Sequence, residues 1–133
     1  MKVVFADTFY FLALLNRRDA RHARAVAASR MPDLRLVTTE FVLIELADAL
    51  CKPQQRNEVA AVWKLAETSP SFQLIRATSE LLQRGRMRYE GRNDKEWPLT
   101  DCISFVVMEE HGLTDVLTAD GHFEQAGFTV LLK

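Results

Sequence analysis

Cysteine, glycine and proline are all scarce in this sequence of 133 residues, which contains 2 Cys, 5 Gly and 4 Pro. Two cysteines cannot form the disulfide framework of a small secreted domain. Cys51 and Cys102 lie in apolar helical patterns, which predicts reduced and buried thiols. No CxxC or HxxxH spacing accompanies them, and this excludes a conventional zinc site. No low-complexity segment, internal repeat or linker is visible.

An excess of charge of one sign is also absent, because 17 Lys and Arg against 18 Asp and Glu give a formal net charge of −1. Without a basic field over the whole molecule, contact with nucleic acid needs a local patch. No apolar run reaches membrane-spanning length, and the N-terminus lacks a signal-peptide pattern. We therefore expect a cytoplasmic protein without a membrane partner, built as a single domain over residues 1–133.

Short apolar strands alternate with helices along the chain. The expected strands cover 2–6, 34–38, 72–76, 114–119 and 128–132. The expected helices cover 8–15, 20–30, 40–51, 57–68, 79–89 and 99–110, with a helical turn at 122–126. Thr39 and Ser79 are the predicted N-caps of two helices. This alternation indicates an open α/β sheet covered on both faces, in which ligands bind beyond the carboxyl ends of the strands.

Four acidic residues fall where such a fold brings side chains to one end of the sheet. Asp7 and Asp120 each end an apolar run, and Glu45 and Asp101 lie on largely apolar helices. Buried carboxylates are costly unless something positive lies between them. Hard oxygen ligands select Mg²⁺ or Mn²⁺ rather than zinc, and such ions polarise a phosphoryl oxygen and generate hydroxide. The constellation therefore predicts metal-dependent hydrolysis of a phosphodiester.

Two of these acids have a structural alternative. Asp101 lies in the first turn of its helix, where the backbone dipole alone favours an anion. Glu45 has apolar neighbours on its helix face and would otherwise need a cationic partner, such as Arg17 or Lys64. Both alternatives stay open at the level of the sequence.

The basic residues near the acids indicate a functional role less strongly than the acids do. His122 follows Asp120 in a tight turn, and we interpret it as structural rather than as a general acid. Arg84 and Arg88 share a helix face, and Arg17 lies in the turn after the first helix. We predict that these arginines bind RNA phosphates around the acidic pocket, as a nuclease requires. A solvated face with salt bridges explains Arg84 and Arg88 equally well.

The strings 99–105 (LTDCISF), 117–123 (LTADGHF) and 126–128 (AGF) resemble the C-terminal half of a PIN domain. The strings 4–8 (VFADT) and 44–46 (IEL) match the other two acidic motifs of that family in order and spacing. The resemblance covers essentially the whole chain, whose length and layout are similar to VapC-type toxins of bacterial toxin–antitoxin pairs. It implies a three-layer α/β/α sandwich with a central, mostly parallel sheet, and a Mg²⁺- or Mn²⁺-dependent ribonuclease.

Carried over by motif, the resemblance places four acids in the catalytic pocket: Asp7, Glu45, Asp101 and Asp120. Asp7 and Asp101 would bind the ion directly, and Asp120 would bind it directly or through water. Glu45 would bind a second ion or help deprotonate the attacking water. Thr8 and Thr118 would hydrogen-bond the carboxylates, although helix capping or strand packing explains either threonine equally well. The implied partners are an RNA substrate, an antitoxin protein and a second copy of the chain in a homodimer.

Competing functions agree less well with the residues. A phosphatase of the haloacid-dehalogenase type needs a second aspartate two residues after Asp7, where Phe9 stands. A signalling receiver domain needs a phosphoacceptor after the third strand, and the segment 72–76 ends in no acid. The remaining alternative is a catalytically silent PIN-fold module that acts by binding protein or RNA, and the presence of all four acids argues against it.

Overall fold

In the computed structural model, which describes residues 2–133, five strands form one sheet whose strands are all parallel. The strands are β1 (Lys2–Ala6), β2 (Leu34–Thr39), β3 (Phe72–Ile75), β4 (Asp115–Leu117) and β5 (Thr129–Val130). Their order across the sheet is β3-β2-β1-β4-β5. β1 is therefore the central strand, and the chain extends the sheet outward from it on both sides.

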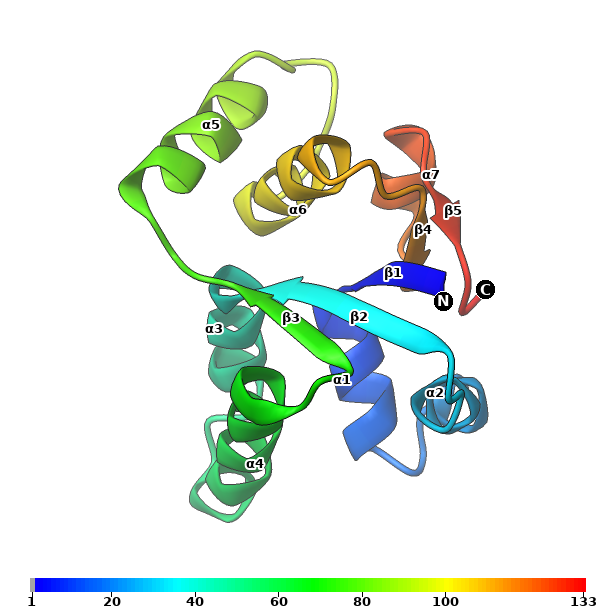
Figure 1. The fold of residues 1–133 in the computed structure, drawn as a ribbon. Coiled ribbons are helices and arrows are strands. Elements are labelled where there is room, and N and C mark those ends of the chain that lie inside the picture. The colour runs from blue at the N-terminus through cyan, green and yellow to red at the C-terminus, as the bar shows by residue number, and fades with distance from the viewer. Residues whose placement is uncertain (1) are drawn as a thin grey trace.

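Helices cover the sheet on both faces (Figure 1). On one face lie α1 (Thr8–Leu15), α2 (His22–Ser29), α3 (Glu40–Ala49) and α4 (Arg56–Thr68), with a short 3-10 helix at Pro53–Gln55. On the other lie α5 (Ser79–Glu90), α6 (Leu99–Glu110) and α7 (Gly121–Gln125). This arrangement confirms the predicted three-layer α/β/α sandwich. None of the helices between residues 2 and 133 is long and apolar enough to cross a bilayer.

The central strand is buried where helices cover both of its faces. Val4, Phe5 and Ala6 are fully buried, as the continuous apolar run predicts. Lys2 and Val3, at the amino end of β1, are exposed, so burial on both faces applies only to the carboxyl half of the strand. The most buried part of the sheet is thus the part that leads directly into the first acidic residue.

Of the two helix N-caps predicted from the sequence, one is confirmed and the other is wrong. Thr39 caps α3 as predicted, because its Oγ1 accepts the N–H of Val42 at 3.1 Å. The prediction of Ser79 as a cap is wrong, since Thr78 caps α5 and accepts the N–H of Leu81 at 3.1 Å. Thr78 has the extended backbone that a cap requires, and Ser79 is already the first helical residue.

The prediction that both cysteines are buried is wrong for Cys51. α3 ends at Ala49 with Leu50 as its C-cap, so Cys51 lies beyond the helix and is exposed. Cys102 is buried within α6, as predicted. An apolar pattern indicates burial only while the helix continues, and the sequence does not mark the end of α3 sharply.

Several expected elements are longer than the observed ones. The expected strands 114–119 and 128–132 pair only as β4 and β5, and the helix expected over 20–30 covers only α2. Beyond Leu117 the regular pairing ends: the N–H of Thr118 bonds to the carbonyl of Val116 at 3.1 Å, while the carbonyl of Thr118 still accepts the N–H of Leu132 at 3.1 Å. The early end of β4 directs the following residues toward the carboxyl end of β1.

Candidate active site

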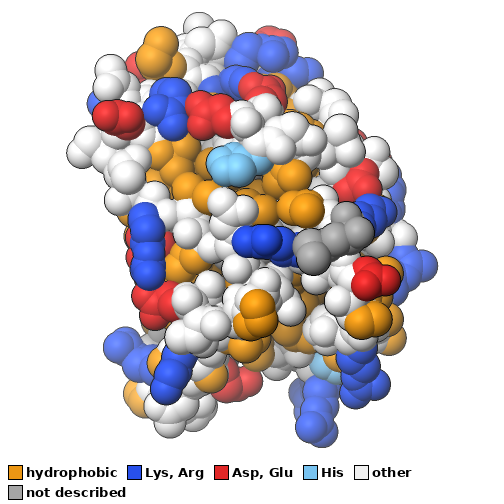
Figure 2. All heavy atoms as spheres, viewed as in Figure 1, with side chains coloured by type: hydrophobic (Ala, Val, Ile, Leu, Met, Phe, Trp, Pro, Cys, Tyr) orange, Lys and Arg blue, Asp and Glu red, His pale blue; other side chains and the backbone are white. Residues whose placement is uncertain are grey.

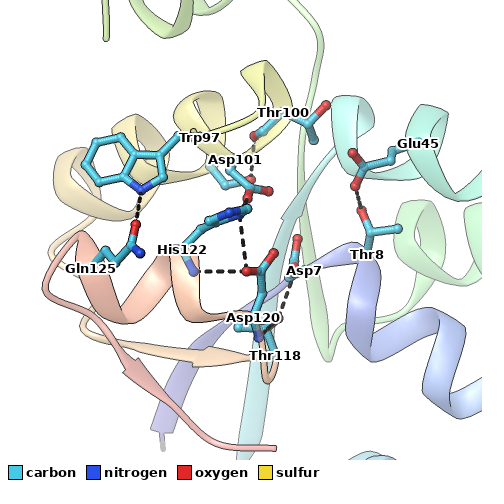
Figure 3. Close-up of polar contacts among 11 residues, drawn as sticks. Asp7, Thr8, Glu45, Trp97, Thr100, Asp101, Thr118, Asp120, His122 and Gln125 are labelled. Carbon is cyan, nitrogen blue, oxygen red and sulfur yellow. Dashed lines mark hydrogen bonds and ion pairs between the residues drawn. The ribbon is translucent and has the colours of Figure 1, made fainter. Parts of the chain in front are cut away.

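Three aspartates from separate segments converge at the carboxyl edge of the sheet (Figure 3). β1 and β4 are neighbours, with Ala6 paired to Leu117, so the residues that follow them emerge side by side. Asp7 follows β1 and is the N-cap of α1, and Asp120 is the N-cap of α7. Asp101 lies in the first turn of α6. The fold thus brings together the aspartates that the sequence singled out.

Asp7 is almost completely buried, with 3% of the residue exposed. Thr118 donates its hydroxyl proton to Oδ2 of Asp7 at 2.9 Å, whereas Oδ1 is buried without a hydrogen-bond partner. Burial, followed by the nearby charge of Asp101, raises the pKa of Asp7 to about 7. A buried carboxylate oxygen without a donor destabilises the fold unless a positive ligand compensates for it.

Asp101 is also buried, with 4% exposed, and it has a histidine beside it. Its Oδ2 lies 3.0 Å from Nδ1 of His122. Burial and then the charge of Asp120 raise the pKa of Asp101 to about 6, although the hydrogen bond with His122 acts in the opposite direction. Two neighbouring carboxyl groups therefore both hold a proton more readily than an exposed aspartate does in the absence of a cation.

The hydroxyl of Thr118 connects two of the aspartates. Its Oγ1 accepts the backbone N–H of Asp120 at 3.1 Å while it donates to Asp7. A hydroxyl has a single proton, so accepting from one neighbour directs that proton to the other. Thr118 thereby fixes which oxygen of Asp7 is occupied and which is free.

Glu45 lies on the α1 and α3 side of the same cluster, half-buried (Figure 3). Thr8 donates its hydroxyl to Oε1 of Glu45. No Lys or Arg in residues 2–133 forms an ion pair with Glu45, so the alternative of a partner at Arg17 or Lys64 is wrong. The charge of Glu45 contributes to raising the pKa of both Asp7 and Asp101, after larger contributions from burial and from neighbouring aspartates.

His122, which the sequence analysis interpreted as structural, lies within the site. Its Nδ1 lies 3.0 Å from Asp101 and 3.2 Å from Oδ1 of Asp120, which also accepts the backbone N–H of His122 at 2.9 Å. Asp120 is the N-cap of α7 and His122 is the second helical residue, so the cap returns the imidazole to the acidic cluster. This offset of two residues after a capping aspartate is the signal that could have identified it.

The arginines predicted to bind RNA lie away from the three aspartates. Arg84 pairs with Glu110 at 2.7 Å and Arg88 pairs with Glu109, both at the end of α6 opposite to its aspartate. Arg17 follows the C-terminal end of α1, whereas the acidic cluster lies at its start. Figure 2 shows basic and acidic side chains interleaved over α5, which fits the salt-bridged alternative for Arg84 and Arg88. Binding of RNA by these three arginines stays a prediction.

The donor set fits a divalent cation. Ligand atoms of Asp101, Asp120 and His122 lie within 4.8 Å of one another. The unpartnered Oδ1 of Asp7 is a further buried carboxylate oxygen at the same edge of the sheet. Carboxylates whose charged forms are disfavoured by burial and by each other are the groups that a cation would stabilise. The arrangement can therefore hold a cation next to an approaching phosphate.

Comparison with known proteins agrees with this geometry. Residues 4–129 match the PIN domain family. The 23S rRNA-specific endonuclease VapC20 of Mycobacterium tuberculosis is 29% identical over 131 residues, with 95% of each chain covered. The crystal structure of that VapC20, a sarcin-ricin loop cleaving toxin, matches with a TM-score of 0.81 and 27% identity, over 96% of this chain and 97% of that one.

More distant structures share the fold. VapBC2 from Rickettsia felis, solved with a DNA fragment from its promoter, matches with a TM-score of 0.65 and 10% identity over 98% of both chains. VapBC-1 from Haemophilus influenzae matches with a TM-score of 0.64 and 14% identity, over 98% of this chain and 97% of that one. The family match covers nearly all of the sequence and includes all four acids, and this chain therefore belongs to the PIN domain family.

Proposed function

We propose that this chain, acting as a single domain over residues 1–133, is a ribonuclease that hydrolyses phosphodiester bonds with Mg²⁺ or Mn²⁺. The observation that carries the proposal is the buried, unpartnered Oδ1 of Asp7 beside Asp101. Asp7, Asp101 and Asp120 would hold the cation. When bound, a divalent cation polarises the phosphoryl group and makes water a better nucleophile at neutral pH.

The remaining side chains of the site have supporting tasks in this proposal. Thr118 occupies Oδ2 of Asp7 and leaves Oδ1 for the cation. Thr8 holds Glu45 through Oε1, which leaves Oε2 to accept a proton from the attacking water or to bind a second ion. In-line attack with loss of the 3′ oxygen leaves products with a 5′-phosphate and a 3′-hydroxyl.

The substrate class follows from similarity rather than from the site alone. VapC20 is a 23S rRNA-specific endonuclease and a sarcin-ricin loop cleaving toxin. We infer that this chain also cleaves a structured RNA, with ribosomal RNA as the first candidate, and that it acts in the cytoplasm, where ribosomes are. As the toxin of a type II pair it would be restrained by an antitoxin protein. Exposed Leu82, Met87 and Tyr89 on α5 suit association into a homodimer.

The test is cleavage of purified ribosomal RNA and total tRNA with Mg²⁺, with Mn²⁺ or with EDTA. Cleavage is expected only with a cation, and Asp101→Asn should reduce it on the order of 100-fold or more. Asp94→Asn is the matched control, because Asp94 is an exposed loop acid paired with Arg92. Equal cleavage by Asp101→Asn, or cleavage in EDTA, would contradict the proposal. A folded protein that binds RNA or protein without cleaving RNA would support the silent module instead.

A further inference from the structure

We propose that His122 is a nitrogen ligand of the cation, together with Asp101 and Asp120, and that the site consequently prefers a first-row transition ion such as Mn²⁺ over Mg²⁺. The inference rests on the proposed function in one respect, namely that a divalent cation binds at this edge of the sheet. It adds a ligand and the chemical class of the ion.

The spacing of the three ligand atoms matches one face of a coordination shell. Nδ1 of His122 lies 3.0 Å from Oδ2 of Asp101 and 3.2 Å from Oδ1 of Asp120. Two ligand atoms at right angles around an ion with bonds of about 2.1 Å are about 3.0 Å apart. These atoms therefore already stand at the separation of neighbouring ligands, and little rearrangement is needed for them to share an ion.

Hydrogen bonding alone does not fully explain why two carboxylates approach the same nitrogen of His122. A proton on Nδ1 can be donated well to one carboxylate, yet two carboxylates approach the same nitrogen. The Oδ1 of Asp120 already accepts the backbone N–H of His122, so a second hydrogen bond from the imidazole is not required to satisfy this oxygen. A cation would satisfy the imidazole and both carboxylates at once.

Asp7 provides an independent indication of a positive ligand in the same cluster. It is 3% exposed, and its Oδ1 has no hydrogen-bond partner. Figure 3 shows Asp7 between the Asp101–His122–Asp120 group and Glu45. The buried oxygen is thus a second, separate reason to expect a positive ligand at this edge of the sheet.

The imidazoles of the other two histidines face backbone carbonyls instead of carboxylates. Nδ1 of His22 lies 2.8 Å from the carbonyl of Ala13, and Nδ1 of His111 lies 3.0 Å from that of Val107. The imidazole of His122 instead faces carboxylates, with 31% of its side chain exposed, so an ion can reach it from solvent. Imidazole favours first-row transition ions, whereas a set of oxygen ligands alone suits Mg²⁺.

The experiment compares metal-free wild type, His122→Ala and His111→Ala by calorimetric titration with Mn²⁺ and with Mg²⁺. The Mn²⁺ complexes are then examined by electron spin echo spectroscopy, in which a coordinated nitrogen modulates the signal. Wild type and His111→Ala should show the nitrogen modulation. His122→Ala should lose it and bind Mn²⁺ about 10-fold more weakly or worse, with little change for Mg²⁺. The substitution keeps the backbone N–H that Asp120 caps.

A second variant, His122→Asp, replaces the nitrogen with oxygen. It should bind Mn²⁺ without nitrogen modulation and shift selectivity toward Mg²⁺, which separates ligation from a loss of folding. Nitrogen modulation that persists in His122→Ala, or Mn²⁺ bound by wild type without modulation, overturns the ligand assignment alone. If wild type binds neither ion, the metal dependence in the proposed function fails as well.

Discussion

At the scale of single residues, the carboxyl group of Asp7 makes the metal-free protein sensitive to pH. Burial raises its pKa from 3.8 to about 7, so between these values the folded state holds a proton that the unfolded state has released. By linkage, stability is fully present below about pH 4 and falls as pH rises toward 7. We expect Asp7→Asn to be more stable than wild type at pH 8 in EDTA, on the order of 2–4 kcal/mol, with a smaller difference at pH 5.

Urea unfolding at the two pH values measures this difference. Asp94→Asn serves as the control, because the ion pair with Arg92 lowers the pKa of that exposed carboxyl group instead. A stability difference between Asp7→Asn and wild type that is the same at pH 5 and pH 8 would contradict the account of the Asp7 carboxyl.

The sequence identified the four acids because each stands at a recognisable place, directly after an apolar run or on an apolar helix. It favoured a structural role for His122, since the direction of that ring depends on the geometry of the α7 cap. The sequence did not decide whether the side chain of Thr118 packs in a strand or hydrogen-bonds a carboxylate. The answer depends on β4 ending at Leu117 rather than two residues later.

At the scale of elements, the close approach of α5 and α6 depends on Gly85. A Cβ at this position would lie 2.2 Å from Cγ1 and 3.2 Å from Cα of Ile103. Alanine would favour the helix by about 1 kcal/mol, but overpacking costs about 1–3 kcal/mol. We expect Gly85→Ala to lower the free energy of unfolding, by about 1–2 kcal/mol in denaturant titrations. Gly121→Ala is the control, with no atom within 4 Å of the added Cβ, and a Gly85→Ala variant as stable as wild type would refute the packing argument.

The N-terminus of α5 offers a matched pair of variants. Thr78 accepts the N–H of Leu81, whereas the side chain of the adjacent Ser79 makes no cap bond. Thr78→Ala should therefore destabilise the protein by about 1 kcal/mol, and Ser79→Ala should have little effect. Thermal unfolding measures both, and the reverse ranking would show that the cap is assigned to the wrong residue.

These elements also show how far the sequence predicts the fold. Periodicity located the five strands and the seven α-helices between residues 2 and 133, but not the short 3-10 helix at Pro53–Gln55. It did not choose between two adjacent capping residues at 78 and 79, and it extended α3 past its real end to Cys51. Such ends depend on backbone angles and on tertiary contacts, which a local pattern does not contain.

At the scale of the whole molecule, a cation that binds only the folded site stabilises the entire domain. We expect Mn²⁺ at 100 times its Kd to raise the free energy of unfolding by about 2.7 kcal/mol. Asp101→Asn should show a much smaller increase, and Asp94→Asn the full one. Thermal unfolding with and without Mn²⁺ measures the effect, and an equal rise in Asp101→Asn would mean that the ion binds elsewhere.

The hydrogen bond between Thr118 and Asp7 joins residues 111 positions apart, and β4 enters the sheet beside β1 only after most of the chain exists. During translation, at about 5–20 residues per second, Asp7 and Glu45 emerge long before their partners on α6 and β4. A growing chain therefore has no assembled site before α6 and the start of α7 have been synthesised. A fragment that stops before Asp120 would consequently lack part of the proposed nuclease site, however well its first strands and helices fold.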